Sequence, residues 1–319
     1  MIIKSKIDMF DEYEVLDKVN TTEYLNDPWN KKYGLGLFFS ALRERGEELF
    51  IPIRIYKNDI EKKFKIHHAL HDGFSALKCL NTELDLDLQI NELKIRKPKS
   101  WTGALFQALT SNPTISHQFK EQDINIGGTD FSEIYFEFPI VSNETALYTN
   151  VITRVCMKHL SVNSKSRWMI PVRTGEGMGL NASYLGIEIA ERDSVSNTQE
   201  KIKEKLIKGE HWGNYLISKL GLFMGRRIIT KGTRNSLAKR KSRWLGSVSN
   251  LGHLGSSEMV DRLVICPPIR WHRPIGASLY QFNGKQCVAL CIHHSLVSAD
   301  LNAIEADITH QINEMLNAK

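Results

Sequence analysis

The sequence contains one arrangement twice: a strand-like run that ends in two consecutive histidines and is followed by a helix-like run. In the first run, residues 62–68, alternation places His68 on the same face as the bulky apolar residues. In the second run, residues 287–294, His294 likewise shares a face with the aliphatic residues. Both patterns predict that the second histidine lies at the inner edge of a core, just before a helix.

Strand-like and helix-like segments alternate along the rest of the chain. Further strands are expected at 33–41, 49–56, 134–138, 168–172, 184–189, 260–265 and 277–282. Helices are expected at 74–84, 103–109, 144–159, 197–223 and 299–316. This alternation predicts an α/β layered fold.

The length of 319 residues allows one large domain or two lobes of about 150 residues each. Hydrophobic residues make up 42% of the chain and charged residues 24%, so a sizeable core can form. Residues 94–129 resemble a crossover, because they contain prolines and a Gly-Gly turn pair. We expect an N-terminal lobe over residues 1–130 and a C-terminal lobe over residues 131–319.

The five cysteines are odd in number and form no Cys-x-x-Cys pair, which favours a reducing, cytoplasmic setting over a disulfide framework. Cys287, Cys291 and His293 share one face of the second run, but three ligands are too few for a closed zinc site, so no metal is expected. Residues 1–18 lack the apolar stretch of a signal peptide. No apolar run approaches the length of a membrane span, so only peripheral membrane contact is expected.

The first histidine pair continues into Asp72-Gly73, and this continuation favours chemistry over packing. A histidine held at a strand end can act as a general base on an acceptor hydroxyl, amine or thiol that attacks an acyl thioester. Asp72 is constrained by the turn, and we expect it to fix the loop through a charge-assisted bond to an arginine. Arg54 and Arg173 are equal candidates for that arginine. Gly73 would allow a close backbone approach at the helix start.

The run His67-His68-Ala69-Leu70-His71-Asp72-Gly73 resembles the His-His-x-x-x-Asp-Gly signature of the chloramphenicol acetyltransferase-like superfamily. That superfamily includes condensation domains of nonribosomal peptide synthetases and wax ester synthase/diacylglycerol acyltransferases. Residues 169–173 with 179–181, and residues 248–252, resemble further segments of the wax ester synthase group, and 293–316 resembles the final strand and helix of chloramphenicol acetyltransferase. The resemblance extends over about residues 33–317.

The resemblance implies two acetyltransferase-like lobes in a V-shaped pseudo-dimer with an active-site tunnel between them. It implies an acyltransferase whose donor is a thioester on coenzyme A or on the pantetheine of an acyl or peptidyl carrier protein, with a small-molecule acceptor and no permanently bound cofactor. His68 would be the base, Asp72 mainly structural, and Ser249 or Asn250 the group that polarises the thioester carbonyl. Residues expected around the substrate are His67, Gly73, Arg173, Asn181 and His294.

Two departures from the family pattern affect these expectations. In the second histidine motif, Ser298-Ala299 stands where Asp-Gly is expected, so His294 is interpreted as a tunnel or packing residue rather than a second base. The stretch before His67 is short for a two-lobed member, which predicts a trimmed N-terminal lobe.

Residues 219–243 form a basic stretch without acidic residues, and they follow an amphipathic run at 215–224. One interpretation is a solvated helix face. The other is a docking patch for the phosphates of coenzyme A, an acidic carrier protein or anionic lipid, with Arg226, Arg227 and Lys231 as the phosphate contacts. The positive charge alone would allow nucleic-acid binding, but no aromatic interleaving and no nucleic-acid motif support it, so no nucleic-acid partner is expected.

Two functions therefore remain open. The chain is either an acyltransferase that uses His68, or a noncatalytic module of the same fold that binds an acyl chain or a carrier protein. The acceptor, the choice between ester and amide products, the donor carrier and the oligomeric state are not encoded in any pattern found here.

Overall fold

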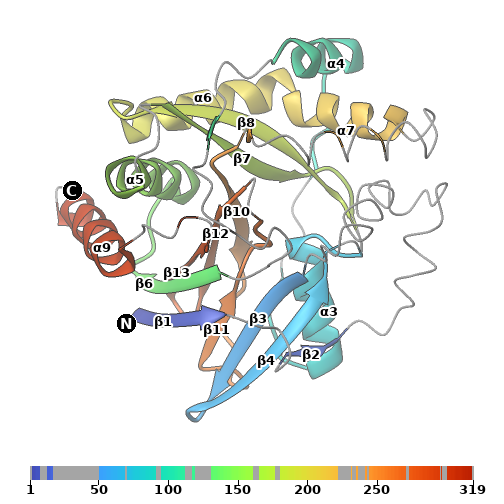
Figure 1. Cartoon of the computed structure of the whole chain (residues 1–319). Helices are drawn as coiled ribbons and strands as arrows, with labels where there is room; N and C mark the ends of the chain where they lie inside the picture. The colour runs from blue at the N-terminus through green and yellow to red at the C-terminus, as the bar shows by residue number, and fades with distance from the viewer. Residues whose placement is uncertain are drawn as a thin grey trace.

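The computed structural model describes residues 2–7, 13–16, 50–68, 70–90, 95–111, 117–118, 131–160, 165–176, 180–221, 231, 235, 241–242, 244–270, 273–294, 296 and 300–317. The strand expected at 33–41 lies outside these residues. The mixed α/β class is confirmed by two sheets with helices packed on them (Figure 1). The V-shaped pairing of two lobes stays a prediction.

The larger sheet has seven strands and passes through the middle of the molecule. Its order is β1 (Ile2–Ile7), β6 (Phe131–Phe138), β13 (Lys285–His293), β12 (Ile275–Phe282), β10 (Gly246–His253), β7 (Lys165–Arg173) and β8 (Ala182–Ala190). Strand β10 runs parallel to both of its neighbours, and the other pairs are antiparallel.

The smaller sheet has four strands and carries the first histidine pair. Its order is β11 (Arg262–Ile265), β3 (Phe50–Lys57), β4 (Ile60–His67) and β2 (Glu14–Val15). Asn58 and Asp59 join β3 to β4 with φ angles of 48° and 63°, the left-handed pair that suits a two-residue hairpin turn. A further pair consists of β5 (His117–Gln118) and β9 (Lys241–Ser242).

Each sheet contains strands from both sides of residue 130. Strand β1 pairs with β6 in the larger sheet, and β11 pairs with β3 in the smaller one. The division into two lobes at that residue stays a prediction.

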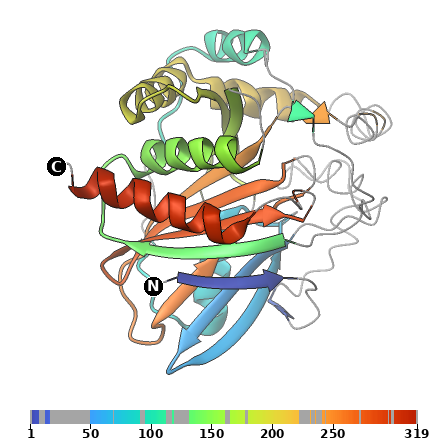
Figure 2. The same ribbon diagram turned by 60° about the vertical axis from the view of Figure 1, so that its left-hand side comes forward.

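Two helices cover one face of the larger sheet. Helix α5 (Glu144–His159) and helix α9 (Leu301–Asn317) lie side by side across it (Figure 2). Their apolar positions, including Val151 of α5 and Ile308 of α9, pack on alternate strand residues. On the other side, helix α3 (Gly73–Leu84), the smaller sheet and the other face of the larger sheet share a second core. The second core is therefore the one that adjoins the histidine motif.

Helices α4 (Trp101–Thr110), α6 (Val195–Lys208) and α7 (Glu210–Gly221) pack outside β8. The single helix expected over 197–223 is wrong, because Gly209 adopts φ 72° and its N–H caps the carbonyls of Lys205 and Leu206. Gly213 of α7 lies so close to the backbone of Ala104 that no side chain fits there. None of the helices in the described ranges is long and apolar enough to cross a membrane.

A charged cluster is buried between the two sheets. Arg54 of β3 forms an ion pair with Glu133 of β6, whose side chain has no exposure, and Cys266 Sγ lies 2.9 Å from the other oxygen of Glu133. Burial raises the pKa of Glu133, against the lowering effect of Arg54. Arg54 thus pairs with Glu133, and of the two candidates for the contact with Asp72 it is not the partner.

Candidate active site

The histidine motif forms a tight loop between the end of β4 and the start of α3. The backbone N–H groups of Leu70 and His71 donate to the carbonyl of His67 at 3.0 and 3.3 Å. The His67 ring is buried and packs edge-on against Phe50, with 5.0 Å between ring centroids. The loop ends at Gly73, where helix α3 begins. His68 lies at the end of the strand and is half-buried.

The ring of His68 is oriented by the loop itself. Its Nδ1 lies 2.9 Å from the carbonyl oxygen of His71. A carbonyl only accepts, so Nδ1 must carry the hydrogen, and the neutral ring then has its lone pair on Nε2. No pattern in the sequence marked His71, because the contact uses its backbone.

The electrostatic surroundings keep His68 uncharged at neutral pH. Burial lowers its pKa to about 4, against the raising effect of the His71 carbonyl, and the positive charges of Arg273 and Arg270 lower it further. A neutral imidazole with an accepting Nε2 is the form that a general base requires.

Asp72 connects the motif loop to a distant hairpin. One carboxylate oxygen accepts from the backbone N–H of Ser75 at 2.8 Å and caps helix α3, and the other accepts from the backbone N–H of Asn181 at 2.8 Å. The expected arginine partner is wrong, since Asp72 forms no ion pair with either candidate arginine within the described residues and its oxygens bind backbone donors. Arg173 instead stacks 3.9 Å from the Phe74 ring centroid and donates from Nε to the Gly175 carbonyl at 2.7 Å.

The hairpin loop after β7 is closed by Asn181. Its carbonyl accepts from the N–H groups of Thr174 and Gly175 at 2.6 and 3.2 Å, and its side-chain amide donates to the backbone carbonyl of Glu176 at 3.1 Å. Arg173 and Asn181 are therefore both at the motif, as positioning groups around Asp72 and α3.

Gly73 lies against strand β10. A Cβ at this position would be 2.9 Å from the Cδ2 atom of buried Leu251, closer than packed carbons lie. The close approach expected of Gly73 is therefore present, and its partner is Leu251.

The two candidates for the oxyanion contact are neighbours on strand β10 and differ in their hydrogen bonds. Asn250 donates through its amide to Glu144 Oε1 and Thr145 Oγ1, both at 2.9 Å, and accepts from the Gly252 N–H. Both amide hydrogens are used, which favours Ser249 of the two candidates for the oxyanion role. Ser249 is half-buried, lies on the same face of β10 as Leu251, and makes no hydrogen bond within the described part of the chain.

The second histidine motif is less clearly defined. His294 is half-buried and its Nε2 lies 3.2 Å from Ser132 Oγ. Residues 297–299, where Asp-Gly is replaced, lie outside the described residues, as do Arg226 and Arg227. Lys231 is exposed. Over the described residues, no group of three or more His, Cys, Asp or Glu side chains is arranged to hold a metal.

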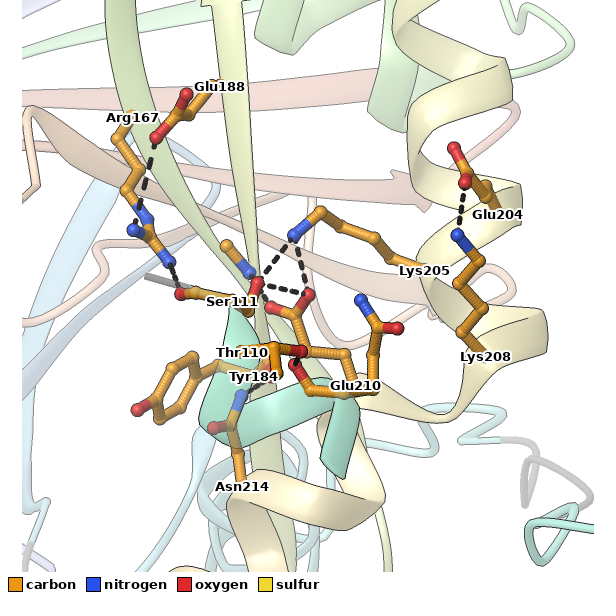
Figure 3. A network of polar contacts seen from close by, with 12 residues as sticks. Thr110, Ser111, Arg167, Tyr184, Glu188, Glu204, Lys205, Lys208, Glu210 and Asn214 are labelled. Carbon is orange, nitrogen blue, oxygen red and sulfur yellow. Dashed lines mark hydrogen bonds and ion pairs between the residues drawn. The ribbon is translucent and has the colours of Figure 1, made fainter. Parts of the chain in front are cut away.

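A polar pocket of about 330 Å³ lies elsewhere, beside β8 and α6. Figure 3 shows Lys205 between Ser111 and the buried Glu210, at 3.0 and 2.5 Å. Its lining includes Lys165 and Ala190, which pair at the far end of the β7–β8 hairpin from Arg173. Eight residue steps of about 3.4 Å place that end of the pocket roughly 27 Å from Arg173. No described residue that lines the pocket belongs to the histidine motif or to β10, so the pocket is treated as separate from the histidine site.

No protein-family model matches the chain, and no curated protein is similar to it. Several solved structures are similar in fold. The epimerization domain from the third module of tyrocidine synthetase B is 11% identical, with a TM-score of 0.42 over 81% of this chain and 71% of that one. A starter condensation domain of rhizomide synthetase, solved with C8-CoA and Leu-SNAC, is 9% identical, with a TM-score of 0.47 over 77% and 63%.

The wax ester synthase/diacylglycerol acyltransferase from Marinobacter aquaeolei VT8 is 11% identical, with a TM-score of 0.45 over 78% of this chain and 66% of that one. The chain thus spans less than two thirds of the length of the last two proteins.

Proposed function

We propose that this chain is an acyltransferase in which His68 is the general base. The donor is an acyl thioester of coenzyme A or of carrier-protein pantetheine, and the acceptor is a small molecule with a hydroxyl or amine. The observation that carries the proposal is the 2.9 Å contact between His68 Nδ1 and the His71 carbonyl, because it leaves Nε2 as the accepting nitrogen.

In the proposed reaction, Nε2 of His68 takes the proton from the acceptor as its oxygen or nitrogen bonds to the thioester carbonyl carbon. The carbonyl electron pair moves onto oxygen, and the hydroxyl of Ser249 donates a hydrogen bond to this oxyanion. The intermediate then collapses, the C–S bond breaks, and the imidazolium returns the proton to the leaving thiolate. Positioned proton transfer is typically worth about 10²- to 10⁴-fold in rate.

The surrounding residues would hold the base in place. Asp72 ties the loop to Asn181, and Arg173 lies against Phe74 at the start of α3. Docking of the donor phosphates on the basic stretch, through Arg226, Arg227 and Lys231, belongs to the same proposal, as does an acyl or peptidyl carrier protein as partner.

The test uses purified protein, a panel of acyl-coenzyme A and acyl-carrier thioesters, and a small-molecule extract of the producing cells, with mass spectrometry of the products. Wild type runs beside His68→Ala and a control, His310→Ala, whose ring is exposed on α9. A new acylated product with wild type and the control, absent with His68→Ala, supports transfer. Full turnover by His68→Ala would overturn the role of the base.

The noncatalytic alternative gives a different result. In that case thioesters bind to wild type, measured by calorimetry, and no donor in the panel produces an acylated product.

A further inference from the structure

Arg273 is a cation that faces no carboxylate of the described residues. Its Nη1 lies 3.1 Å from Met169 Sδ, and its Nη2 donates to the Pro268 carbonyl at 3.1 Å. Its Nε is buried and has no hydrogen-bond partner. Within the described residues it forms no ion pair with any Asp or Glu.

A buried charge without an opposite charge beside it is unfavourable, and this lowers the pKa of the Arg273 guanidinium. Burial lowers the pKa of Arg273 to about 10, so the group stays charged at neutral pH although it is poorly solvated. The buried Nε and the single contacts of the two Nη atoms leave donors unused on a planar fork. A bound anion would satisfy both the charge and the donors.

Arg273 reaches the sheet face that leads to the histidine motif. Met169, which Arg273 contacts, is the neighbour of Ser247 on β10. Gly276 is the neighbour of Ser247 on its other side, and side chains of residues 267 and 269 cover Gly276. Ser247 shares its face of β10 with Ser249 and Leu251 because side chains alternate along a strand.

The far end of that face meets the motif itself. Leu251 lies against Gly73, the first residue of α3. The electrostatic interaction of Arg273 with His68 agrees with this placement.

We propose that Arg273 binds the carboxylate of the acceptor, so that the acceptor is a hydroxy acid or an amino acid. This inference rests on the proposed function. A carboxylate carries one negative charge and matches the edge of a guanidinium with two parallel hydrogen bonds. A donor phosphate is separated from its thioester by the whole pantetheine arm, whereas a carboxylate near the base belongs to the molecule that loses its proton there.

A carboxylate bound at Arg273 would change the pKa of His68. Arg273 and Arg270 from the loop before β12, and His67 from β4, are the groups whose charges oppose protonation of His68. A carboxylate on Arg273 would offset one of them and raise the pKa of His68. Binding of the acceptor would thus make the base stronger.

The binding test titrates acetate into the full chain at neutral pH, where the probe is ionised, and follows the ring of His68. Nitrogen-15-labelled histidine is followed by NMR, and His68 is assigned by comparison with His68→Ala. We expect acetate to shift the nitrogen-15 signals of His68 in wild type, and neutral acetamide to leave them unchanged. In Arg273→Gln we expect acetate to bind about 10- to 100-fold more weakly, since a charged hydrogen-bond pair is lost. Arg273→Lys keeps the charge without the fork and should lie between.

Three results would overturn the carboxylate site: acetate without effect on wild type, an equal effect on Arg273→Gln, or a response to inorganic phosphate alone. Melting temperatures of the variants control for folding, and we expect Arg273→Gln to melt no lower than wild type because it removes an unpaired charge. The binding test does not depend on turnover. Acetate binding without any acyl product would therefore refute the proposed function but support the carboxylate site.

Once an acceptor is known, steady-state rates test its assignment. We expect Arg273→Gln to raise KM for the acceptor about 10-fold or more and leave KM for the thioester unchanged. A rise confined to the thioester would show that the carboxylate belongs to the acyl group, and would overturn the assignment.

Discussion

Oδ2 of Asp72 accepts a hydrogen bond from the backbone N–H of Asn181, a residue 109 positions away, at 2.8 Å. The same carboxylate caps α3 through Ser75, so one side chain holds three elements together: the motif loop, the helix that follows it and the β7–β8 hairpin. The loop that orients His68 therefore depends on a contact between distant parts of the chain.

Asp72→Asn should loosen this contact. An amide offers one accepting oxygen, so one of the two backbone N–H groups faces an NH₂ group instead. We expect a loss of about 1.5–3 kcal/mol in the free energy of unfolding, together with slower acyl transfer. Urea denaturation and kcat measure the two effects. Asp300→Asn is the matched control, because Asp300 caps α9 with similar contacts to Asn302 and Ala303. Equal effects of both variants on kcat would refute the positioning role.

The pH dependence of transfer should reflect the buried position of His68. A base works only when deprotonated, and burial lowers its pKa to about 4, so kcat/KM in the free enzyme should stay level from neutral pH down to about pH 5 and fall through about pH 4. An acid limb centred near pH 6.5, the ordinary value for histidine, would contradict this.

The free energy of unfolding should also depend on the protonation of His68 between about pH 4 and pH 6.5. The unfolded chain protonates this histidine near pH 6.5 and the folded chain near pH 4, so the unfolded state binds more protons between these values. The free energy of unfolding should therefore fall as the pH falls from about 6.5 to about 4. Urea denaturation across this range should show a smaller change for His68→Ala than for wild type.

Ser249 and Asn250 should respond differently to alanine substitution. Ser249→Ala should slow transfer by about 10²- to 10³-fold and leave stability nearly unchanged, because it removes a donor to the oxyanion. Asn250→Ala should lower the free energy of unfolding by about 1–3 kcal/mol, since it leaves Glu144 and Thr145 without their amide partner. Paired measurements of kcat and melting temperature separate the two. A large rate loss in Asn250→Ala at unchanged stability would contradict the assignment.

Glu133→Gln should be strongly destabilising. It leaves Arg54 charged in the space between the two sheets, and breaking one side of a buried ion pair typically costs about 3–5 kcal/mol. Chemical denaturation measures the loss. Glu61→Gln, at the half-exposed end of the same cluster, is the control and should cost less than about 1 kcal/mol.

Local patterns in the sequence predicted the elements well where one periodicity dominates. The helix at 144–159 and the strands that end in the two histidine pairs follow directly from apolar spacing. The break at Gly209 was missed because the apolar spacing continues through it, and only the left-handed backbone angle reveals it.

The contacts of the site were harder to predict. Asp72 binds backbone N–H groups, and these carry no residue identity that a sequence could display. Arg54 was one of two candidates for the contact with Asp72, and its pairing with Glu133 could not be predicted because the two residues meet only once the two sheets stack. Arg273 could not be recognised at all, since its distinguishing property is the lack of an acidic neighbour among the described residues.

Each sheet combines strands that lie far apart in the sequence, and this affects the order in which the chain can fold. Strand β3 needs β11 as a neighbour, and Lys57 meets Asp261 across a separation of 204 residues. During synthesis, the β3–β4 hairpin would emerge from the ribosome long before β11 exists, with one edge open to other chains. Pairing over such separations is slow, so the open edge of β3 persists until residues 262–265 have been made and have folded back onto it.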